Sequence, residues 1–333
     1  MNPILVNVYR GNVVESVHRG SFVVVDHCGH TIASAGDSTR AVFPRSSLKL
    51  IQALPLIETG AADALNIGAH QIALACASHN GEEVHHHTSE AWLRDIGLYE
   101  SHLECGAAWP SHQDTLCEWA ANQGQARKVI HNCSGKHCGL LSVCQHLDIP
   151  VEGYSQYEHP IQNYWFKVLD ELTGLDSRTL DWDYDGCGLP ALSLPMDKMA
   201  YAMAQFSPNA DQSPSRKAAM ARILGAIIDN PYLLAGKERL CSLLPPASAG
   251  RVVGKIGAEG YYTAVIPELG YGLALKIDDG AARAAEVALW GVMVKLGLEP
   301  WFDKDALRET WRPSIKNSQG KVVGHLSAAQ DNY

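Results

Sequence analysis

The stretch Arg45-Ser46-Ser47-Leu48-Lys49 places a serine and a lysine three residues apart, where a helix is predicted to begin. Positions i and i+3 lie on one face of a helix, so we expect the amine of Lys49 to reach the hydroxyl of Ser46. A serine hydroxyl is a weak nucleophile near neutral pH and needs an adjacent base. The pattern therefore indicates a candidate catalytic dyad, although it also fits a serine near a helix N-cap followed by a solvated lysine.

The composition is that of a soluble globular protein. The 333 residues are 46% hydrophobic and 19% charged, with a net charge of −9, which disfavours nucleic acid and anionic membranes as partners. No stretch approaches the roughly 18 to 20 apolar residues that cross a bilayer. The N-terminus lacks the basic head and long apolar run of a secretory signal, so we expect a cytoplasmic protein. Its nine cysteines are then expected as buried thiols, metal ligands or reactive groups rather than disulfides.

Alternating apolar residues predict strands at both ends of the chain. Near the N-terminus, short strands are expected over residues 4–9, 13–18, 21–26 and 31–35, separated by glycine-containing turns. Near the C-terminus, residues 261–266 and 271–277 are predicted to form a hairpin, followed by a helix over residues 281–296. The last stretch of the chain is polar, and we expect it to be loosely held.

The middle of the chain is predicted to be mostly helical. Amphipathic patterns favour helices over residues 84–96, 157–172 and 214–228, and a helix over residues 46–58 that is bent or shortened by Pro55. Residues 243–249, with two prolines, are expected to form a connecting loop. We therefore predict an α/β (α+β) fold with an antiparallel sheet flanked by helices. Residues 1–333 would form one catalytic domain, with a sheet lobe from both chain ends and a helical lobe from the middle.

Two further motifs resemble those of penicillin-recognising serine enzymes. Ser78-His79-Asn80 has the form of their Ser-x-Asn element, and Lys255-Ile256-Gly257 stands just before the terminal hairpin, where they carry Lys-Thr-Gly. The order of the motifs along the chain also agrees, which implies the fold of serine β-lactamases and penicillin-binding proteins. Ile256 lacks the hydroxyl that would bind a β-lactam carboxylate. The sequence therefore favours a shared architecture with a different substrate.

A second cluster combines cysteine, lysine and histidine with glycines. It consists of His131-Asn132-Cys133-Ser134-Gly135-Lys136-His137-Cys138 and the distant Asp185-Gly186-Cys187-Gly188. Such loops suggest a metal site or a reactive thiol. Because Cys133 and Cys138 are not two residues apart, as in a zinc ribbon, a tight turn with buried thiols is the alternative interpretation.

Together these motifs resemble the signatures of the Rhizobium-type (class 3) L-asparaginases. The resemblance rests on Arg45-Ser46-Ser47-Leu48-Lys49, Asn132-Cys133-Ser134-Gly135-Lys136-His137, Asp185-Gly186-Cys187-Gly188-Leu189-Pro190 and Lys255-Ile256-Gly257-Ala258-Glu259-Gly260, and it spans nearly the whole chain. It implies an amidohydrolase that converts L-asparagine to L-aspartate and ammonia. It also implies a homodimer with a fold similar to serine β-lactamases and a zinc ion close to the substrate.

The resemblance assigns roles to individual side chains. It implies two serine–lysine tandems, Ser46 with Lys49 and Ser78 with Lys255, in which Ser46 is the nucleophile. Lys276, near the same hairpin, is the other candidate for the last position. The implied zinc ligands are Cys133, Lys136 and Cys187. The residues implied around the bound amino acid are Arg45, His137 and Asp185.

Elementary chemistry is consistent with these roles. A lysine amine acts as a base or a metal ligand only when uncharged, and holding a lysine uncharged at pH 7 costs about 4.6 kcal/mol given a reference pKa of about 10.4. Burial and a nearby cation both act in that direction. Two thiolates and a neutral amine would give a zinc site without net charge and with one open position.

Two other functions would use parts of the same motifs, and one further motif resembles a metal site. A penicillin-recognising hydrolase would share the serine–lysine motif but act on β-lactams or D-Ala peptides. A non-catalytic zinc or thiol sensor would use Cys133, Cys138 and Cys187 and leave Ser46 dispensable. His85-His86-His87 resembles a metal-binding tract, but consecutive helical residues point in different directions, so we expect a solvated surface.

Overall fold

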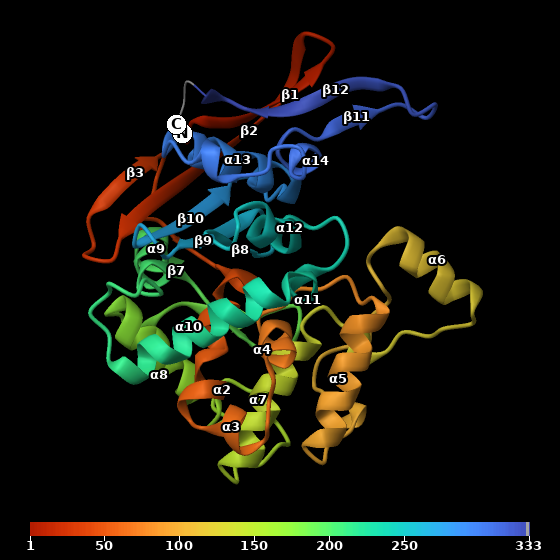
Figure 1. Ribbon diagram of the computed structural model, residues 1–333, viewed down its shortest axis with the longest axis vertical. Coiled ribbons are helices and arrows are strands. Elements are labelled where there is room, and N and C mark those ends of the chain that lie inside the picture. Colours follow the sequence, from red (N-terminus) through yellow and green to blue (C-terminus); the bar gives the residue numbers. More distant parts are fainter. Residues whose placement is uncertain (331–332) are drawn as a thin grey trace. The chain divides into compact units, whose positions relative to one another are not determined.

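Strands from both ends of the chain meet in one antiparallel sheet. A computed structural model describes residues 1–330 and 333, and the chain divides into two compact units (Figure 1). Unit 1 contains Met1–Ser47, Ser193–Asp211 and Leu243–Tyr333, and unit 2 contains Leu48–Leu192 and Gln212–Ser242. That the whole chain is a single catalytic domain stays a prediction.

The sheet of unit 1 has the strand order β11-β12-β1-β2-β10-β9-β8, with β3 also paired to β2. All of these pairs are antiparallel. The strands are β1 (Ile4–Arg10), β2 (Val13–Asp26), β3 (Thr31–Ala35), β8 (Val253–Ile256), β9 (Tyr261–Ile266), β10 (Tyr271–Ile277), β11 (Ser314–Lys316) and β12 (Val322–Ala328). The predicted hairpin is confirmed, since β9 and β10 begin and end at the predicted residues.

Helices cover both faces of this sheet. Side chains alternate between the two faces of a strand, and the β10 residue Gly272 faces the backbone of α9 (Met196–Ala204). On the other face, the ring of Phe22 stacks on Tyr333, which lies against Gly291 of α13 (Ala282–Lys295). The remaining elements of unit 1 are β4 (Ala41–Val42), β7 (Leu194–Pro195), η5 (Glu299–Trp301) and α14 (Arg308–Trp311).

Three predictions in unit 1 are wrong. The two strands predicted over residues 13–18 and 21–26 form the single strand β2. The strand continues through Gly20, because a Cβ atom at this position would lie 2.4 Å from the carbonyl oxygen of Lys276 and glycine has none. The polar C-terminal stretch is held in the sheet where it is described, since residues 324–328 of β12 pair with β1, while residues 331–332 lie outside the described residues. The predicted loop over residues 243–249 is mostly helical, in α12 (Leu240–Ala247), because its leucines are buried despite the two prolines.

Unit 2 is built mainly from helices packed on one another. They are α1 (Lys49–Gln52), α2 (Leu54–Glu58), α3 (Ala61–Ala64), α4 (Ala69–Ala75), α5 (Glu83–Asp95), η2 (Glu100–His102), α6 (Gln113–Ala121), η3 (Lys128–Ile130), α7 (Ser134–His146), α8 (Gln162–Thr173), η4 (Ser177–Thr179), α10 (Pro214–Asp229) and α11 (Pro231–Ala235). A small antiparallel pair, β5 (Trp182–Tyr184) and β6 (Pro190–Leu192), completes the unit. Its core includes the fully buried Trp92 and Trp165.

The predicted helices of unit 2 are present, with shifted boundaries. The helix expected over residues 46–58 is interrupted at Ala53, two residues before Pro55, so that it forms the 3₁₀ helix η1 (Arg45–Leu48), α1 and α2. The helix expected from residue 157 begins only at Gln162, after Pro160. The general prediction of an antiparallel sheet flanked by helices is confirmed.

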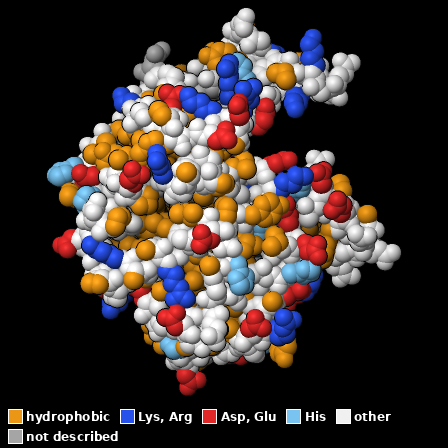
Figure 2. All heavy atoms as spheres, viewed as in Figure 1, with side chains coloured by type: hydrophobic (Ala, Val, Ile, Leu, Met, Phe, Trp, Pro, Cys, Tyr) orange, Lys and Arg blue, Asp and Glu red, His pale blue; other side chains and the backbone are white. Residues whose placement is uncertain are grey.

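The surface carries charges of both signs, and the helices have the lengths expected from the composition. On the face drawn in Figure 2, acidic and basic side chains are intermixed. Within residues 1–330 and 333, no helix combines the length and the apolar character needed to span a membrane.

We predict opposite effects of alanine at two glycines. A Cβ atom on Gly272 would lie 2.0 Å from the carbonyl oxygen of Ala200, whereas one on Gly225, in α10, meets no atom within 4 Å. Gly272→Ala is therefore expected to lower the free energy of unfolding by about 1 to 3 kcal/mol. Gly225→Ala is expected to raise it by about 0.5 to 1 kcal/mol. Urea unfolding of both variants checks this, and equal effects would contradict the close packing of α9 on β10.

Candidate active site

The predicted nucleophile lies in a tight turn that begins a helical stretch. Ser46 is half-buried in η1, and Lys49 opens α1 directly after it. The preceding residue, Arg45, has a φ angle of 53°, in the left-handed region that costs energy for a residue with a Cβ atom. Such strain persists only where the surroundings impose it, and it is frequent at functional positions.

Within unit 1, the strand that carries Lys255 lies against this turn. A Cβ atom on Gly257 would approach the carbonyl oxygen of Pro44 to 2.2 Å, so only glycine fits there. The hydroxyl of Thr263, on β9, donates to the carbonyl oxygen of Ser47 at 3.2 Å. Lys255 is buried, and its amine donates to the carbonyl of Ile256 at 2.8 Å. The glycine of Lys-Ile-Gly therefore has a packing role beside the Ser46 turn.

The alternative lysine at the hairpin has a different environment. Lys276 is on β10, and its amine donates to the carbonyl oxygens of Glu259 and Ile277 at 2.5 and 2.6 Å. Burial is the main cause of a lowered pKa of Lys276. Lys255 lies on β8, two residues before the Gly257 that packs on the Ser46 turn, whereas Lys276 lies on β10.

In unit 2, the amine of Lys49 is fully buried and lies among three acceptors. It donates to the carbonyl oxygen of Ala77, to Ser78 Oγ at 3.0 Å and to Cys133 Sγ at 3.1 Å. These contacts join two motifs that lie far apart in the sequence. The sequence predicted pairs of Ser46 with Lys49 and of Ser78 with Lys255, and both pairings stay predictions. The contact of Lys49 with Ser78 is additional to them.

The three predicted metal ligands are also brought together in unit 2. Lys136 Nζ lies 3.2 Å from Cys187 Sγ, and both cysteines are buried. A hydrogen bond from the Cys187 thiol lowers the pKa of Cys133, with help from the charges of Lys49 and Lys136. The same hydrogen bond, together with burial, raises the pKa of Cys187. Of the two cysteines, Cys133 is thus the one whose thiolate form is favoured.

The donor set of Cys133, Lys136 and Cys187 fits a zinc ion, provided that these groups lose their protons when the metal binds. Burial disfavours the ammonium form of Lys136, but Cys187, Cys133 and Asp185 outweigh it and raise the pKa of Lys136. In the metal-free protein Lys136 is therefore a cation beside sulfur. Two sulfurs and one nitrogen are ligands that zinc prefers, and their binding to a metal releases protons.

Glycines determine how this cluster is built. A Cβ atom on Gly135, in the first turn of α7, would lie 2.1 Å from the carbonyl oxygen of Leu74 at the end of α4. This close approach fixes the start of the helix that carries Lys136. Gly188, directly after Cys187, has a φ angle of 84° and forms a turn in which its amide donates to Asp185. The glycines of both motifs are thus structurally required.

The predicted substrate-binding residues have different environments. His137 is fully buried, and its Nδ1 atom lies 2.6 Å from the hydroxyl of Tyr154, while its Nε2 atom is buried without a hydrogen-bond partner in the described part of the chain. Asp185 is half-buried and accepts from the amide of Gly186. Arg45 is half-buried at the Ser46 turn.

Sequence analysis missed a buried polar network beside Ser78. His79 Nε2 lies 3.0 Å from Ser134 Oγ, which in turn lies 2.9 Å from Ser89 Oγ. The ring of His79 stacks on that of His85 at 4.6 Å. Burial holds the pKa of His79 well below its usual range. The position of His79 inside Ser78-His79-Asn80 was the one available signal for this network.

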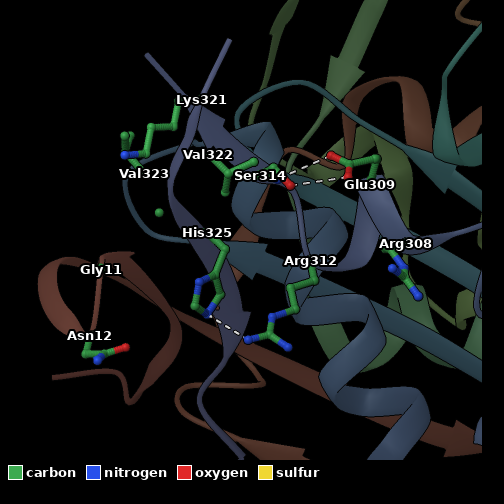
Figure 3. A pocket seen from close by; sticks show the side chains of 11 residues that line it. Gly11, Asn12, Arg308, Glu309, Arg312, Ser314, Lys321, Val322, Val323 and His325 are labelled. Carbon is green, nitrogen blue, oxygen red and sulfur yellow. Dashed lines mark hydrogen bonds between the residues drawn. The ribbon is translucent and has the colours of Figure 1, made fainter. Parts of the chain in front are cut away.

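Neither the exposed cysteines nor one open groove in unit 1 includes a predicted site residue. Cys28 and Cys117 are exposed, unlike the buried thiols that were expected. An open groove of about 830 Å³ in unit 1 is lined by residues of the sheet edge and α14, such as Arg312 and His325 (Figure 3). It contains none of the predicted site residues.

Comparisons with known proteins agree with the motifs. A family model described as L-asparaginase II matches residues 6–328, which confirms the resemblance seen in the sequence. No curated protein sequence matches the chain significantly. A β-lactamase from Mycobacterium bovis is 15% identical over 85% of this chain and 95% of its own, with a TM-score of 0.41. A penicillin-binding protein homologue from Pyrococcus abyssi, described as octameric, is 13% identical over 84% and 74%, with a TM-score of 0.33.

The buried, neutral His79 predicts a fall of stability in acid. Because its pKa is lowered in the folded state, the unfolded chain binds a proton that the folded chain does not, once the pH falls below about 6.5. The free energy of unfolding should therefore decrease by up to about 1.4 kcal/mol per pH unit from this group. Urea unfolding between pH 7.5 and 5 is expected to show a shallower slope for His79→Gln than for the wild type. An identical slope would contradict it, and His70→Gln, at an exposed position, is the control.

Proposed function

Since the chain belongs to the L-asparaginase II family, we propose that it hydrolyses the side-chain amide of L-asparagine through the nucleophile Ser46. The chain is an amidohydrolase, and the products are L-aspartate and ammonia. The observation that carries the mechanism is the fully buried amine of Lys49, in contact with Ser78 and Cys133. A lysine at the surface could not supply a base at neutral pH, whereas a buried one can.

In the first step, Ser46 Oγ attacks the amide carbon of the substrate. Lys49, three residues further on, takes the hydroxyl proton as the new C–O bond forms. The C–N bond then breaks, and the leaving nitrogen takes up a proton to depart as ammonia. Acyl transfer of this kind needs a nucleophile and a base close together, and Ser46 and Lys49, three residues apart in the chain, are proposed to supply them.

Ser78 is assigned to proton relay. Its hydroxyl accepts a hydrogen bond from Lys49 at 3.0 Å, so a proton can pass between amine and hydroxyl without movement of the backbone. In the second step, water attacks the acyl group on Ser46 and gives up a proton by the same route, the ester C–O bond breaks, and Ser46 Oγ takes the proton back as L-aspartate leaves. Lys255, buried on β8, is proposed as the partner of Ser78 in this relay.

Cys133, Lys136 and Cys187 are proposed to hold a zinc ion. When bound, zinc would supply a positive charge for the α-amino or α-carboxylate group of the substrate. Arg45, His137 and Asp185 are proposed to surround that part of the amino acid. Because Lys49 donates to Cys133, loss of the thiolate character of Cys133 would also change the environment of the base.

Two rival functions make different demands on these residues. A zinc or thiol sensor needs Cys133, Cys138 and Cys187 but neither Ser46 nor Lys49. A penicillin-recognising hydrolase needs the serine and lysine, but Ile256 stands where it would need a hydroxyl. We also propose that the enzyme acts as a cytoplasmic homodimer, an expectation from the class 3 resemblance that sedimentation analysis of the purified protein checks.

We predict that Ser46→Ala and Lys49→Met each reduce ammonia release from L-asparagine by at least about 10³-fold, since they remove the nucleophile and its base. Coupled measurement of ammonia, with circular dichroism to verify folding, checks this. Ser34→Ala and Lys198→Met, at exposed positions, are the matched controls.

Retained activity in a folded Ser46→Ala variant would exclude this nucleophile. Turnover of a chromogenic cephalosporin without ammonia release from asparagine would favour the penicillin-recognising alternative instead. Loss of zinc binding with unchanged asparagine hydrolysis would show that the reaction does not need the metal.

We predict that protein purified without added metal contains about one tightly held zinc per chain at the thiol cluster. Cys133→Ser or Cys187→Ser should abolish this content, because each removes a sulfur ligand. Elemental analysis measures it, with Cys241→Ser, at a buried cysteine outside the predicted ligand set, as the control. A wild-type protein without metal, whose affinity for asparagine does not change when zinc is added, would contradict the zinc assignment.

A further inference from the structure

The helix α5 carries two histidines and two glutamates on one face. Successive residues of a helix point 100° apart, so His86 and His87 stand at the two borders of this face. Glu83, one turn before them, and Glu90, one turn after them, lie between these two directions. We propose that His86, His87 and Glu90 form a second metal site, which binds a divalent transition-metal ion of the zinc type.

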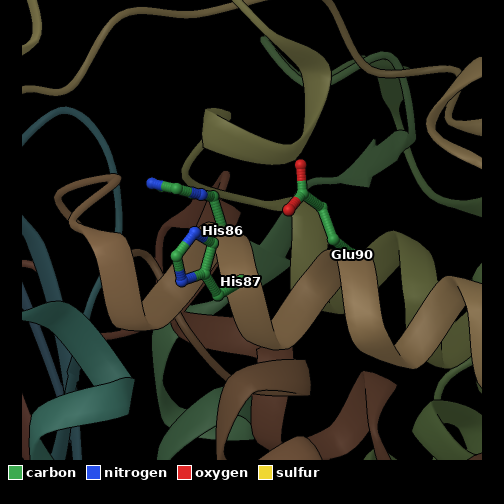
Figure 4. Close-up of side chains that lie close together, drawn as sticks. All are labelled: His86, His87 and Glu90. Atoms are coloured by element: carbon green, nitrogen blue, oxygen red, sulfur yellow. The ribbon is translucent and has the colours of Figure 1, made fainter.

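The distances between the donor atoms support binding of one metal ion by all three side chains. One donor atom from each of these three side chains lies within 4.8 Å of the others. The rings of His86 and His87 are 4.6 Å apart in an edge-to-face arrangement. Figure 4 shows the two imidazoles beside each other on α5, with Glu90 one turn further along. Donors bound to one zinc ion at about 2.0 to 2.2 Å lie closer together than this limit, so rotation of the side chains would have to bring them around the metal.

The burial of His86 contradicts the prediction that this tract is a solvated surface. His85 and His86 are buried and only His87 is exposed. The prediction failed because the sequence does not show that Trp119, from α6, packs edge-on against His86. Within the described residues, His86 Nδ1 is buried without a hydrogen-bond partner, and such an atom is expected to have a ligand or a water.

A cavity lined by two of the three side chains, His86 and His87, gives an ion access and further oxygen ligands. It has a volume of about 250 Å³ and is lined by His86 and His87 together with Glu83 and Glu118. Glu83 already lies 3.6 Å from His87 Nδ1. Either carboxylate, or water in the cavity, can fill a fourth position around the metal.

One cation competes for this site. Arg127 forms an ion pair with Glu90 at 2.5 Å and another with Glu100. A carboxylate has two oxygens and can serve a guanidinium and a metal together. Since Glu100 also receives Arg127, partial release of Glu90 leaves the arginine paired.

Two imidazoles with carboxylate define the class of ion. This donor set suits zinc, copper or nickel, whereas magnesium and calcium prefer oxygen ligands alone. The site contains no cysteine, so it is chemically distinct from the cluster of Cys133, Lys136 and Cys187. The proposal does not depend on the proposed function of Ser46.

Zinc titration of a protein without the thiol cluster tests the proposal. In a Cys133→Ser/Cys187→Ser background, calorimetric titration with zinc chloride is expected to show about one equivalent bound with micromolar affinity. His87→Ala and Glu90→Gln should each weaken this binding by at least about tenfold, since even residues that only support a metal ligand are worth that much. His30→Ala, which removes an exposed histidine beside the carboxylate of Asp26, should leave it unchanged.

These variants distinguish loss of zinc binding from loss of folding. His87 and Glu90 are partly exposed, so their substitution should leave the melting temperature close to that of the parent. Absence of zinc binding in the parent protein, or binding that both substitutions leave unchanged, would overturn the proposal. Neither result would bear on asparagine hydrolysis by the wild type, which is measured separately.

Discussion

The hydrogen bonds of one buried amine organise the candidate active site. Lys49 is fully buried, and its amine meets three acceptors, which are the carbonyl of Ala77, the hydroxyl of Ser78 and the sulfur of Cys133. An unpaired amine in this place would be costly, so its acceptors must be held in position. The packing of α4 and α7 through Gly135 holds them there.

This contact couples the two chemistries that the sequence presents separately. The Ser-x-x-Lys motif is proposed to provide a nucleophile and a base, and the cysteine motifs are proposed to provide metal ligands. Because the same amine lies against Cys133, the charge of the sulfur cluster acts directly on the proposed base. A metal on that cluster is thus expected to alter both the position of the substrate and the proton affinity of its surroundings.

Sequence reasoning located the elements and motifs but not their long-range partners. The β9–β10 hairpin was predictable because its alternation and turn residues are local. The single strand β2, the pairing of β12 and the burial of His86 depend on distant residues such as Lys276 and Trp119. Likewise, the family resemblance predicts Cys133 and Cys187 as metal ligands, but no periodicity indicates that Lys49 lies beside Cys133.

Covalent trapping tests the central claim most directly. An L-asparagine analogue whose amide is replaced by a diazoketone should alkylate the side chain that attacks the substrate, and peptide mass spectrometry then identifies it. We expect the label on Ser46 in the wild type and its loss in Lys49→Met, because the serine is unactivated without the amine. Label on Ser78 or Cys133, or undiminished labelling of Ser46 without Lys49, would contradict the account.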